Sequence, residues 1–152
     1  METLTIRRLD AYEWINHPDR KTLIDEYAEE SSLDVMPEFC PDYDMYRYFD
    51  SIGIAAVFGA FKGESQIGFA NLLITRNPHY SCLIATVESV FVRSEHRNTG
   101  AGLELLKAMQ DYATKEGAKA LFVSAGAQTR FAQVLARRGF TNTNMIFAKK
   151  LS

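Results

Sequence analysis

The stretch FVRSEHRNTGAGLELLKAM, residues Phe91–Met109, decides how the chain is built. Its first residues are apolar and β-branched or aromatic, as in a strand, and its last residues have the apolar spacing of a helix. Gly100 and Gly102 stand where that helix must begin, although glycine destabilises a helix by up to about 1 kcal/mol relative to alanine. Either the glycines form a plain turn, or a ligand approaches the backbone closely there.

A strand, a glycine turn and a helix N-terminus together favour an anion site. The first backbone N–H groups of a helix lack internal acceptors and carry the positive end of the helix dipole. Glycine allows a phosphate to reach those groups, and Arg97 can add charge-assisted hydrogen bonds. The spacing does not match the G-x-G-x-x-G dinucleotide fingerprint or a Walker loop. On physical grounds alone, phosphate binding and a plain strand-to-helix turn both stay open.

Outward from this stretch, the hydrophobic pattern predicts an alternation of strands and helices. The predicted strands are residues 4–10, 54–63, 66–76, 81–93, 118–126 and one bent strand or two short ones within 140–151. The predicted helices are one or two within 12–31, a short one around 45–53, one that ends at Gly117 and one at about 128–138. The nearly continuous apolar run of 81–93 predicts a central strand. This order predicts one mixed α/β domain with six to seven strands.

Composition excludes several other classes of protein. The chain has 152 residues and a formal net charge of −2, which gives no electrostatic argument for nucleic acid or an anionic membrane. No apolar run approaches the roughly 20 residues that span a bilayer, and the N-terminus lacks the apolar core of a signal peptide. Two cysteines and three scattered histidines predict neither a disulfide framework nor a metal site. Cys40 has acidic neighbours, which disfavour a catalytic thiolate. We expect a soluble cytoplasmic protein without a metal.

Two segments resemble a known family. RNTGAG, Arg97–Gly102, directly after the strand ESVFV, resembles the acyl-CoA signature Arg/Gln-x-x-Gly-x-Gly/Ala of the GNAT superfamily of N-acetyltransferases. SAGAQTRFAQVLARRGF, residues 124–140, is similar to the last helix of that family, and the order of elements matches its fold. The resemblance covers most of the chain. It implies one GNAT-like acyltransferase domain, α/β (α+β), over residues 1–152, with helices on both faces of the sheet.

The resemblance also implies where acetyl-CoA binds as co-substrate. The pyrophosphate of coenzyme A would sit on the glycine turn, and the pantetheine would pair with the strand before it. The implied contact residues are Val90, Phe91, Val92, Arg97, Asn98, Thr99, Gly100, Ala101, Gly102, Gln128 and Phe131. Gln128 and Phe131 replace the family's usual asparagine and alanine. Residues 36–53 and 74–97 resemble, more specifically, members encoded by phages and prophages.

Glu88 is the candidate general base. Attack on a thioester needs a neutral amine, whereas a lysine-like amine has a pKa of about 10.4, so a base near the acetyl group is useful. A glutamate in the apolar strand TVESV is costly to bury unless it is paired or protonated. It corresponds to the acidic residue that many family members use as base or to hold a water. A strand residue that faces the open side of the sheet is the alternative.

The family's general acid is missing. Family members commonly have a tyrosine four residues before the Gly-Phe pair, and here that position is Leu135. Tyr80, beside His79, and Ser124 are candidate catalytic substitutes, although they also suit a loop cap and a strand end. The backbone N–H of Val90 would stabilise the carbonyl oxygen, as the resemblance implies. Two functions stay open: an N-acetyltransferase, and a non-catalytic module that binds acyl-CoA or another protein.

The acceptor side is expected near the first helices. Acidic and aromatic residues mix there: Asp25, Glu26, Glu29, Glu30, Asp34, Glu38, Asp42 and Asp44 with Phe39, Tyr43, Tyr46 and Tyr48. Such a surface would attract a cationic amine, while solvated helix faces are the plainer interpretation. We expect a primary amine of a small molecule or peptide as acceptor, and no nucleic acid or membrane partner. A monomer and a homodimer are both open.

Overall fold

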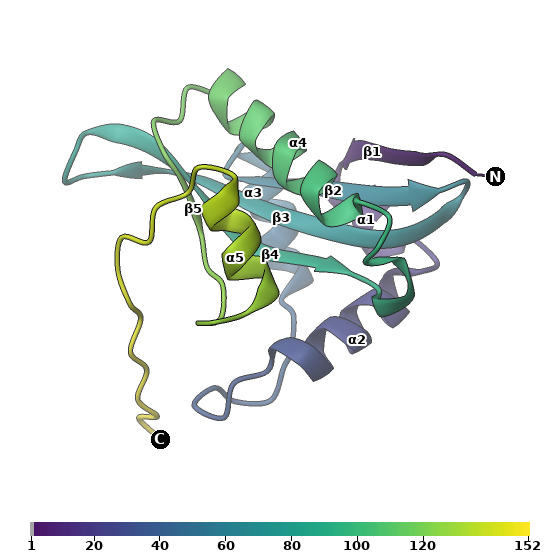
Figure 1. The fold of residues 1–152 in the computed structure, drawn as a ribbon, viewed down its shortest axis with the longest axis horizontal. Coiled ribbons are helices and arrows are strands. Elements are labelled where there is room, and N and C mark those ends of the chain that lie inside the picture. The colour runs from purple at the N-terminus through teal and green to yellow at the C-terminus, as the bar shows by residue number, and fades with distance from the viewer. Residues whose placement is uncertain (1) are drawn as a thin grey trace.

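The computed structural model describes residues 2–152, which fold around one mixed sheet (Figure 1). Within them the sheet has five strands in the order β1-β2-β3-β4-β5. Their bounds are Leu4–Leu9, Ala55–Lys62, Ser65–Asn77, Cys82–Val92 and Leu121–Val123. The first four strands pair antiparallel, and β5 pairs parallel to β4. A parallel pair needs a crossover connection, and α4 supplies it.

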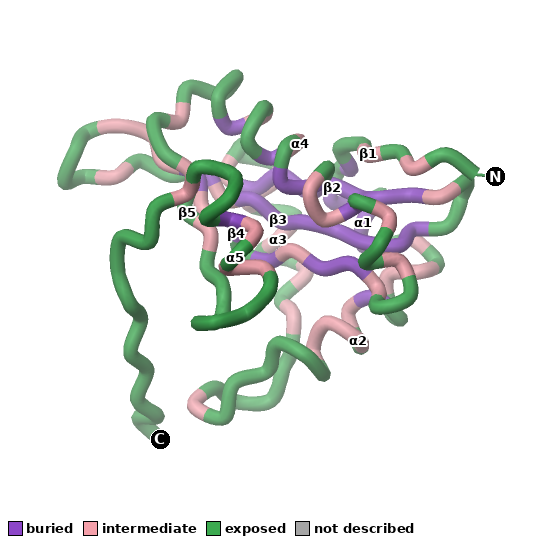
Figure 2. The backbone as a smooth tube through the Cα atoms, viewed as in Figure 1, coloured by how far each residue is buried: buried purple, intermediate pink, exposed green. Residues whose placement is uncertain are grey.

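Helices cover both faces of the sheet, as the resemblance implied. Their bounds are Ala11–Asn16 (α1), Arg20–Ser31 (α2), Tyr43–Ser51 (α3), Ala101–Lys115 (α4) and Arg130–Arg137 (α5), and a 3₁₀ turn spans Ser94–His96. On one face Leu105 and Met109 of α4 pack on the sheet, and Leu135 of α5 joins them. On the other face Trp14 and Leu23 pack against aromatic residues of β3 and β4. In Figure 2 the buried residues lie mainly along the central strands. No helix within residues 2–152 is long and apolar enough to cross a membrane.

Local hydrogen bonds set the starts of α1 and α3. Asp10 and Glu13 form a reciprocal capping box that begins α1, with Glu13 N–H to Asp10 Oδ1 at 2.7 Å and Asp10 N–H to Glu13 Oε2 at 3.1 Å. Asp42 begins α3 by accepting the N–H of Met45 at 3.0 Å. At the other end of the chain, α4 stops just before Gly117, as predicted.

Two predictions about the sheet are wrong. Six to seven strands were expected, but residues 140–152 form no strand, and Met145 and Phe147 are 76% and 86% exposed. The predicted strand at 118–126 shortens to β5, whose Phe122 is exposed. The long apolar strand β4 lies inside the sheet, between β3 and β5, as predicted. An apolar segment can form a strand only where a neighbouring strand has unpaired backbone groups along its edge. The hydrophobic pattern of the segment gives no information about such a neighbour.

Candidate active site

Glu88 is the extra residue of a β-bulge. The register between β3 and β4 shifts at this point: Asn71 lies opposite Ser89, and Leu72 lies opposite Val87. In a regular strand Glu88 would take the next place in the alternation after Val87. Every later residue of β4 would then face the opposite side of the sheet from the one it faces in this structure. The bulge absorbs one residue, so the rest of β4 keeps its packing and Glu88 remains outside the ladder.

Both oxygens of Glu88 accept hydrogen bonds from hydroxyl groups. Tyr46 Oη of α3 donates to Oε1 at 2.8 Å, and Ser89 Oγ donates to Oε2 at 2.8 Å. Asn71 Nδ2 of β3 donates in turn to Ser89 Oγ at 3.0 Å. Ser89 and Asn71 are buried, whereas Glu88 is exposed. The carboxylate is therefore held on a buried polar support and still faces solvent.

Two tyrosines beside Glu88 are held in their neutral form. Burial, followed by the negative charge of Glu88, raises the pKa of the Tyr46 hydroxyl far above its ordinary value. The same two causes, in the same order, raise the pKa of Tyr27. Tyr46 can therefore act as a hydrogen-bond donor throughout the physiological range of pH. Its contact with Glu88 was missed from the sequence, because no periodicity connects residues 42 positions apart.

The two strands beside the candidate base separate at Glu88. The parallel pairing of β4 with β5 ends at Val87 and Val123. Ser124 follows β5 directly and is exposed, so by register it lies about level with Glu88. Beyond this level, Val90 and the end of β4 pair with β3 alone within residues 2–152. An edge of backbone is thus available for a ligand that enters between the strands.

The glycine turn presents unpaired backbone N–H groups. Gly100 is the N-cap of α4 with φ 84°, and Glu104 N–H is the first to bond back along the helix, to Gly100 O at 3.1 Å. Within residues 2–152 the N–H groups of Gly102 and Leu103 have no acceptor. A Cβ built on Gly102 would meet only Val92 Cγ2, at 3.9 Å, so the space before the turn is open. This geometry fits a bound phosphate.

The arginine of the signature faces α2. Arg97 Nε donates to Val92 O at 2.9 Å, and Nη2 lies 2.7 and 2.6 Å from the two carboxylate oxygens of Glu30. Arg93 pairs in the same way with Glu26, which raises the pKa of the Arg93 guanidinium. Two ion pairs therefore join α2 to the end of β4 and to the turn.

Other residues of the turn shape its backbone. Thr99 Oγ1 donates to His96 O at 2.6 Å and accepts the N–H of Ala101 at 3.3 Å. Asn98 lies between Arg97 and Thr99 and is exposed. Of the strand residues, Phe91 and Val92 are buried, and Val92 Cγ2 lies beside Gly102.

The structure does not bring Tyr80 to Glu88. Tyr80 is 76% exposed in the turn between β3 and β4, and Cys82, at the start of β4, is six positions before Glu88. At about 3.3 Å per residue this is roughly 20 Å. Leu135 is buried in the core, so the position of the family's tyrosine presents no polar group.

The start of α5 lies past the end of β5. Gln128 has φ 61° in the turn before Thr129, which caps α5 by accepting the N–H of Ala132 at 3.2 Å. Phe131, in the first turn of α5, is partly buried against the α4 core. The two residues that the resemblance placed at the cofactor thus stand at this helix start.

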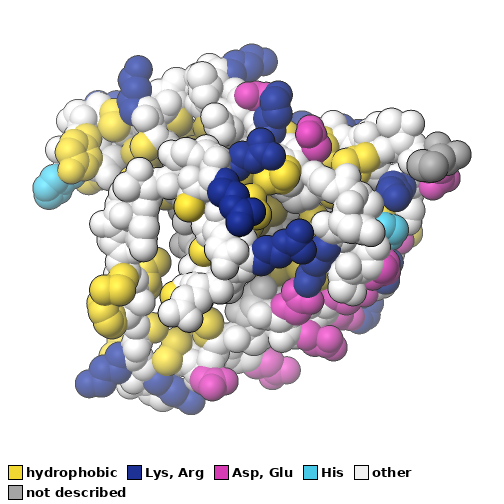
Figure 3. Space-filling view, viewed as in Figure 1, with side chains coloured by type: hydrophobic (Ala, Val, Ile, Leu, Met, Phe, Trp, Pro, Cys, Tyr) yellow, Lys and Arg dark blue, Asp and Glu magenta, His cyan; other side chains and the backbone are white. Residues whose placement is uncertain are grey.

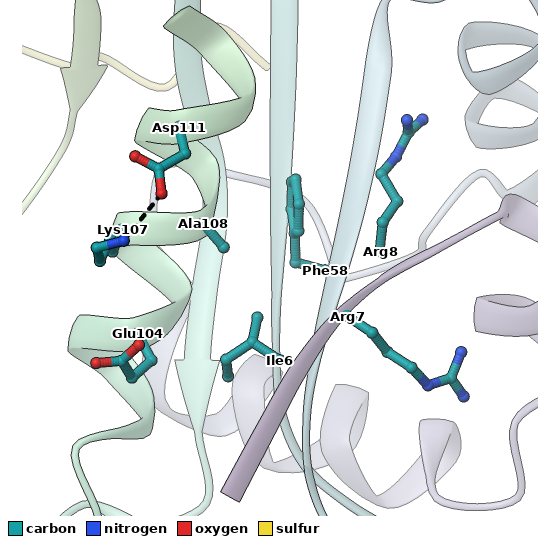
Figure 4. A pocket seen from close by; sticks show the side chains of 8 residues that line it. All are labelled: Ile6, Arg7, Arg8, Phe58, Glu104, Lys107, Ala108 and Asp111. Atoms are coloured by element: carbon teal, nitrogen blue, oxygen red, sulfur yellow. Dashed lines mark hydrogen bonds and ion pairs between the residues drawn. The ribbon is translucent and has the colours of Figure 1, made fainter. Parts of the chain in front are cut away.

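Basic and acidic side chains gather over different parts of the surface. In Figure 3 Lys and Arg side chains lie between α4 and α5, and Asp and Glu side chains gather around α2. A shallow hollow lies on another edge, between β1 and α4 (Figure 4). It is lined by Ile6, Phe58 and Ala108, with the ion pair Lys107–Asp111 at 3.0 Å on its rim. It includes no residue of the β4 bulge or the glycine turn.

Solved structures share this fold at low identity. An aminoglycoside acetyltransferase, meta-AAC0020, from an uncultured soil metagenomic sample in complex with sisomicin, has a TM-score of 0.76 and 18% identity over 98% of this chain and 97% of its own. A second such enzyme, HMB0005, also from a soil metagenomic sample, has a TM-score of 0.78 and 15% identity over 99% of each chain. Ribosomal-protein-alanine N-acetyltransferase from Brucella melitensis has a TM-score of 0.70 and 17% identity over 97% of each chain.

No curated protein matches the sequence. The sequence profile of the acetyltransferase (GNAT) family, in contrast, matches residues 10–140, which include every element from α1 to α5. The chain therefore belongs to the acetyltransferase (GNAT) family.

Proposed function

We propose that this protein is an acetyl-CoA-dependent N-acetyltransferase that acts on a primary amine. The observation that carries the proposal is the position of Glu88: a carboxylate supported by Tyr46 and Ser89 at the level where β4 and β5 separate. The glycine turn follows on the same strand with unpaired N–H groups of Gly102 and Leu103. A base and a phosphate site at two points of one strand fit a long acyl donor that lies along it.

The cofactor contacts follow from this arrangement. The backbone of Gly100, Ala101 and Gly102 binds the pyrophosphate, with Asn98 and Thr99 at the turn. Arg97 holds the turn against α2 and supplies positive charge beside it. The backbone of β4 from Val90 to Val92 pairs with the pantetheine, and Gln128, in the turn before α5, and Phe131, in its first turn, flank it.

The proposed reaction needs one proton acceptor and one carbonyl donor. Glu88 removes a proton from the ammonium group of the acceptor, directly or through water, so that a neutral amine attacks the thioester carbon. The Val90 N–H donates to the carbonyl oxygen as charge develops there. The new C–N bond forms, the attacking nitrogen gives up its second proton, and the C–S bond breaks as the CoA thiolate takes up one proton, so the products are the amide, the CoA thiol and one proton held by Glu88. Ser124, level with Glu88, is the nearer of the two proposed catalytic substitutes, and Tyr80 is the more distant one.

The acceptor side is less acidic than its sequence suggests. Four of its carboxylates are in ion pairs: Asp25 with Lys21, Glu26 with Arg93, Glu30 with Arg97, and Asp44 with Arg47. The ring of Tyr27 lies near Glu88, and the centroid of the Phe39 ring is 5.9 Å from that of Tyr27. We propose a cationic amine of a small molecule or a peptide terminus. The structural neighbours include enzymes named for aminoglycosides and for a ribosomal-protein alanine.

A non-catalytic acyl-CoA-binding or protein-interaction module is the second candidate, and buried Leu135 favours it. The kinship of residues 36–53 and 74–97 with phage-encoded members, a cytoplasmic location and a homodimer stay predictions.

An assay of thiol release from acetyl-CoA with a panel of amines tests the proposal. The panel holds an aminoglycoside, a polyamine, free amino acids and an alanine-terminated peptide. Glu88→Gln should lower turnover by about 10² to 10⁴ while CoA binding persists, because the amide keeps the shape but accepts no proton. Glu116→Gln, the same change at an exposed position after α4, is the control. Binding of CoA without turnover of any amine would favour the non-catalytic module.

A further inference from the structure

We infer that Tyr46 is the positioning residue that fixes the Glu88 carboxylate relative to the acceptor, an inference that rests on the proposed function. Tyr46 Oη donates to Glu88 Oε1 at 2.8 Å across 42 residues of sequence. Within residues 2–152 it is the one hydrogen-bond partner of Glu88 that lies outside the sheet. The contact therefore joins the helical layer on the acceptor side to the strand that carries the base.

The direction of the hydrogen bonds is determined by the chemistry of the groups. Ser89 has one hydroxyl proton, which goes to Glu88 Oε2, so Ser89 Oγ can only accept from Asn71 Nδ2. Tyr46 likewise has one proton, which goes to Oε1. With one bond to each oxygen, from two different layers, rotation of the carboxylate is opposed at both ends. Each oxygen retains a lone pair that can accept a proton from the acceptor amine.

Helix α3 is anchored so that Tyr46 has a fixed position. Asp42 caps its first turn through Met45 N–H at 3.0 Å. In its last turn Asp50 Oδ2 accepts the N–H of Ala11 at 3.1 Å, and Arg8 Nη2 lies 3.5 Å from Asp50 Oδ1. A helix whose first turn is capped and whose last turn is bonded to α1 and β1 presents the Tyr46 phenol in a fixed position. Pre-organised supports of this kind keep a catalytic group within the narrow geometry that proton transfer needs.

Removal of the Tyr46 hydroxyl is the first test. Tyr46→Phe should lower kcat by about tenfold to a hundredfold, the effect of losing one hydrogen bond to a charged group, with KM for acetyl-CoA unchanged. Tyr12→Phe is the matched control, since Tyr12 of α1 is 74% exposed, has no hydroxyl partner within residues 2–152 and is not part of the acceptor surface. An unchanged kcat in Tyr46→Phe, or an equal loss in Tyr12→Phe, overturns the inference.

A double-mutant cycle tests whether Tyr46 acts through Glu88. In the Glu88→Gln background, Tyr46→Phe should cost less than threefold, because the carboxylate to be positioned is already gone. A structural role would lower the rate by the same factor in both backgrounds, and that result overturns the inference. If Glu88→Gln has the wild-type rate, the assignment of the base in the proposed function fails as well.

A measurement without turnover keeps the two proposals distinguishable. In protein with ¹³C-labelled tyrosine, the Tyr46 ring should begin to titrate at lower pH in Glu88→Gln than in the wild type, since the opposing negative charge is removed. The resonance of exposed Tyr12 should not move. An unmoved Tyr46 titration overturns the contact itself. A wild type that acetylates no amine, with the Tyr46 shift present, overturns the proposed function and the positioning role but not the contact.

Discussion

At Gly102 the needs of the helix and of a ligand conflict. The residue is helical, and a Cβ there would meet only Val92 Cγ2 at 3.9 Å, so alanine fits without strain. Gly102→Ala should raise the free energy of unfolding by about 0.5 to 1 kcal/mol, because alanine is the better helix former. The same methyl group narrows the approach to the turn and should weaken CoA binding. Urea unfolding and calorimetric titration with CoA measure the two effects.

A glutamate at position 102 distinguishes the effect on CoA binding from the effect on helix stability more clearly. Gly102→Glu should abolish CoA binding, because its charge would lie against the pyrophosphate. Gln110→Glu adds the same charge on the exposed side of α4, two turns further on, and should bind CoA as the wild type does. If Gly102→Glu is folded and binds CoA normally, the turn has no role in binding.

At the scale of elements, two ion pairs join α2 to the strand and turn of the candidate cofactor site. Glu30 is paired with the guanidinium of Arg97, the arginine that precedes the glycine turn. Glu30→Gln should release this charge toward the phosphates and lower the Kd for CoA by up to about fivefold, since exposed pairs contribute about 1 kcal/mol or less. The gain should shrink as the salt concentration rises.

Glu29→Gln is the matched control for this prediction. It removes the same charge from the neighbouring position of α2, and Glu29 forms no ion pair within residues 2–152. A similar increase in affinity in both variants would mean that the overall charge of α2, and not the pair with Arg97, sets the effect. Calorimetric titration of both variants with CoA measures the difference.

The elements themselves were largely predictable, and their junctions were not. Helix α4 was found from its apolar face and its end at Gly117, and the β2–β3 hairpin from its glycine turn. The bulge at Glu88 was not predictable, because it is a mismatch between two strands, and neither strand alone carries a sign of it. The contact of Tyr46 with Glu88 depends on that bulge and was missed for the same reason.

At the scale of the whole molecule, the C-terminal segment lies apart from the folded body (Figure 1). Met145, Ile146, Phe147 and Leu151 are each at least 76% exposed. A chain that ends at Thr143 should therefore have the wild-type free energy of unfolding to within about 0.5 kcal/mol, as surface changes usually do. It should also bind CoA as tightly as the full chain. Urea unfolding of both chains measures the comparison.

Phe140 packs on the folded body and contributes to its stability. Its N–H donates to Leu135 O at 3.1 Å, and its ring packs on the α4 core, so a chain that ends at Gly139 should be less stable. A stability loss above about 1 kcal/mol in the chain that ends at Thr143 would show that residues 144–152 bury apolar surface. The hydrophobic pattern predicted strands in this segment, since it records only the apolar residues and not whether a partner strand is present.

The bulge in β4 also has a consequence for how such a site can arise. Asn71 faces Ser89 and Leu72 faces Val87, so the ladder on either side would close without a gap if residue 88 were absent. A single inserted codon is enough to add the carboxylate, and its deletion would restore a regular strand with the same core. The same deletion would leave the buried Ser89 hydroxyl without its acceptor, so the carboxylate and the polar residues beneath it depend on one another.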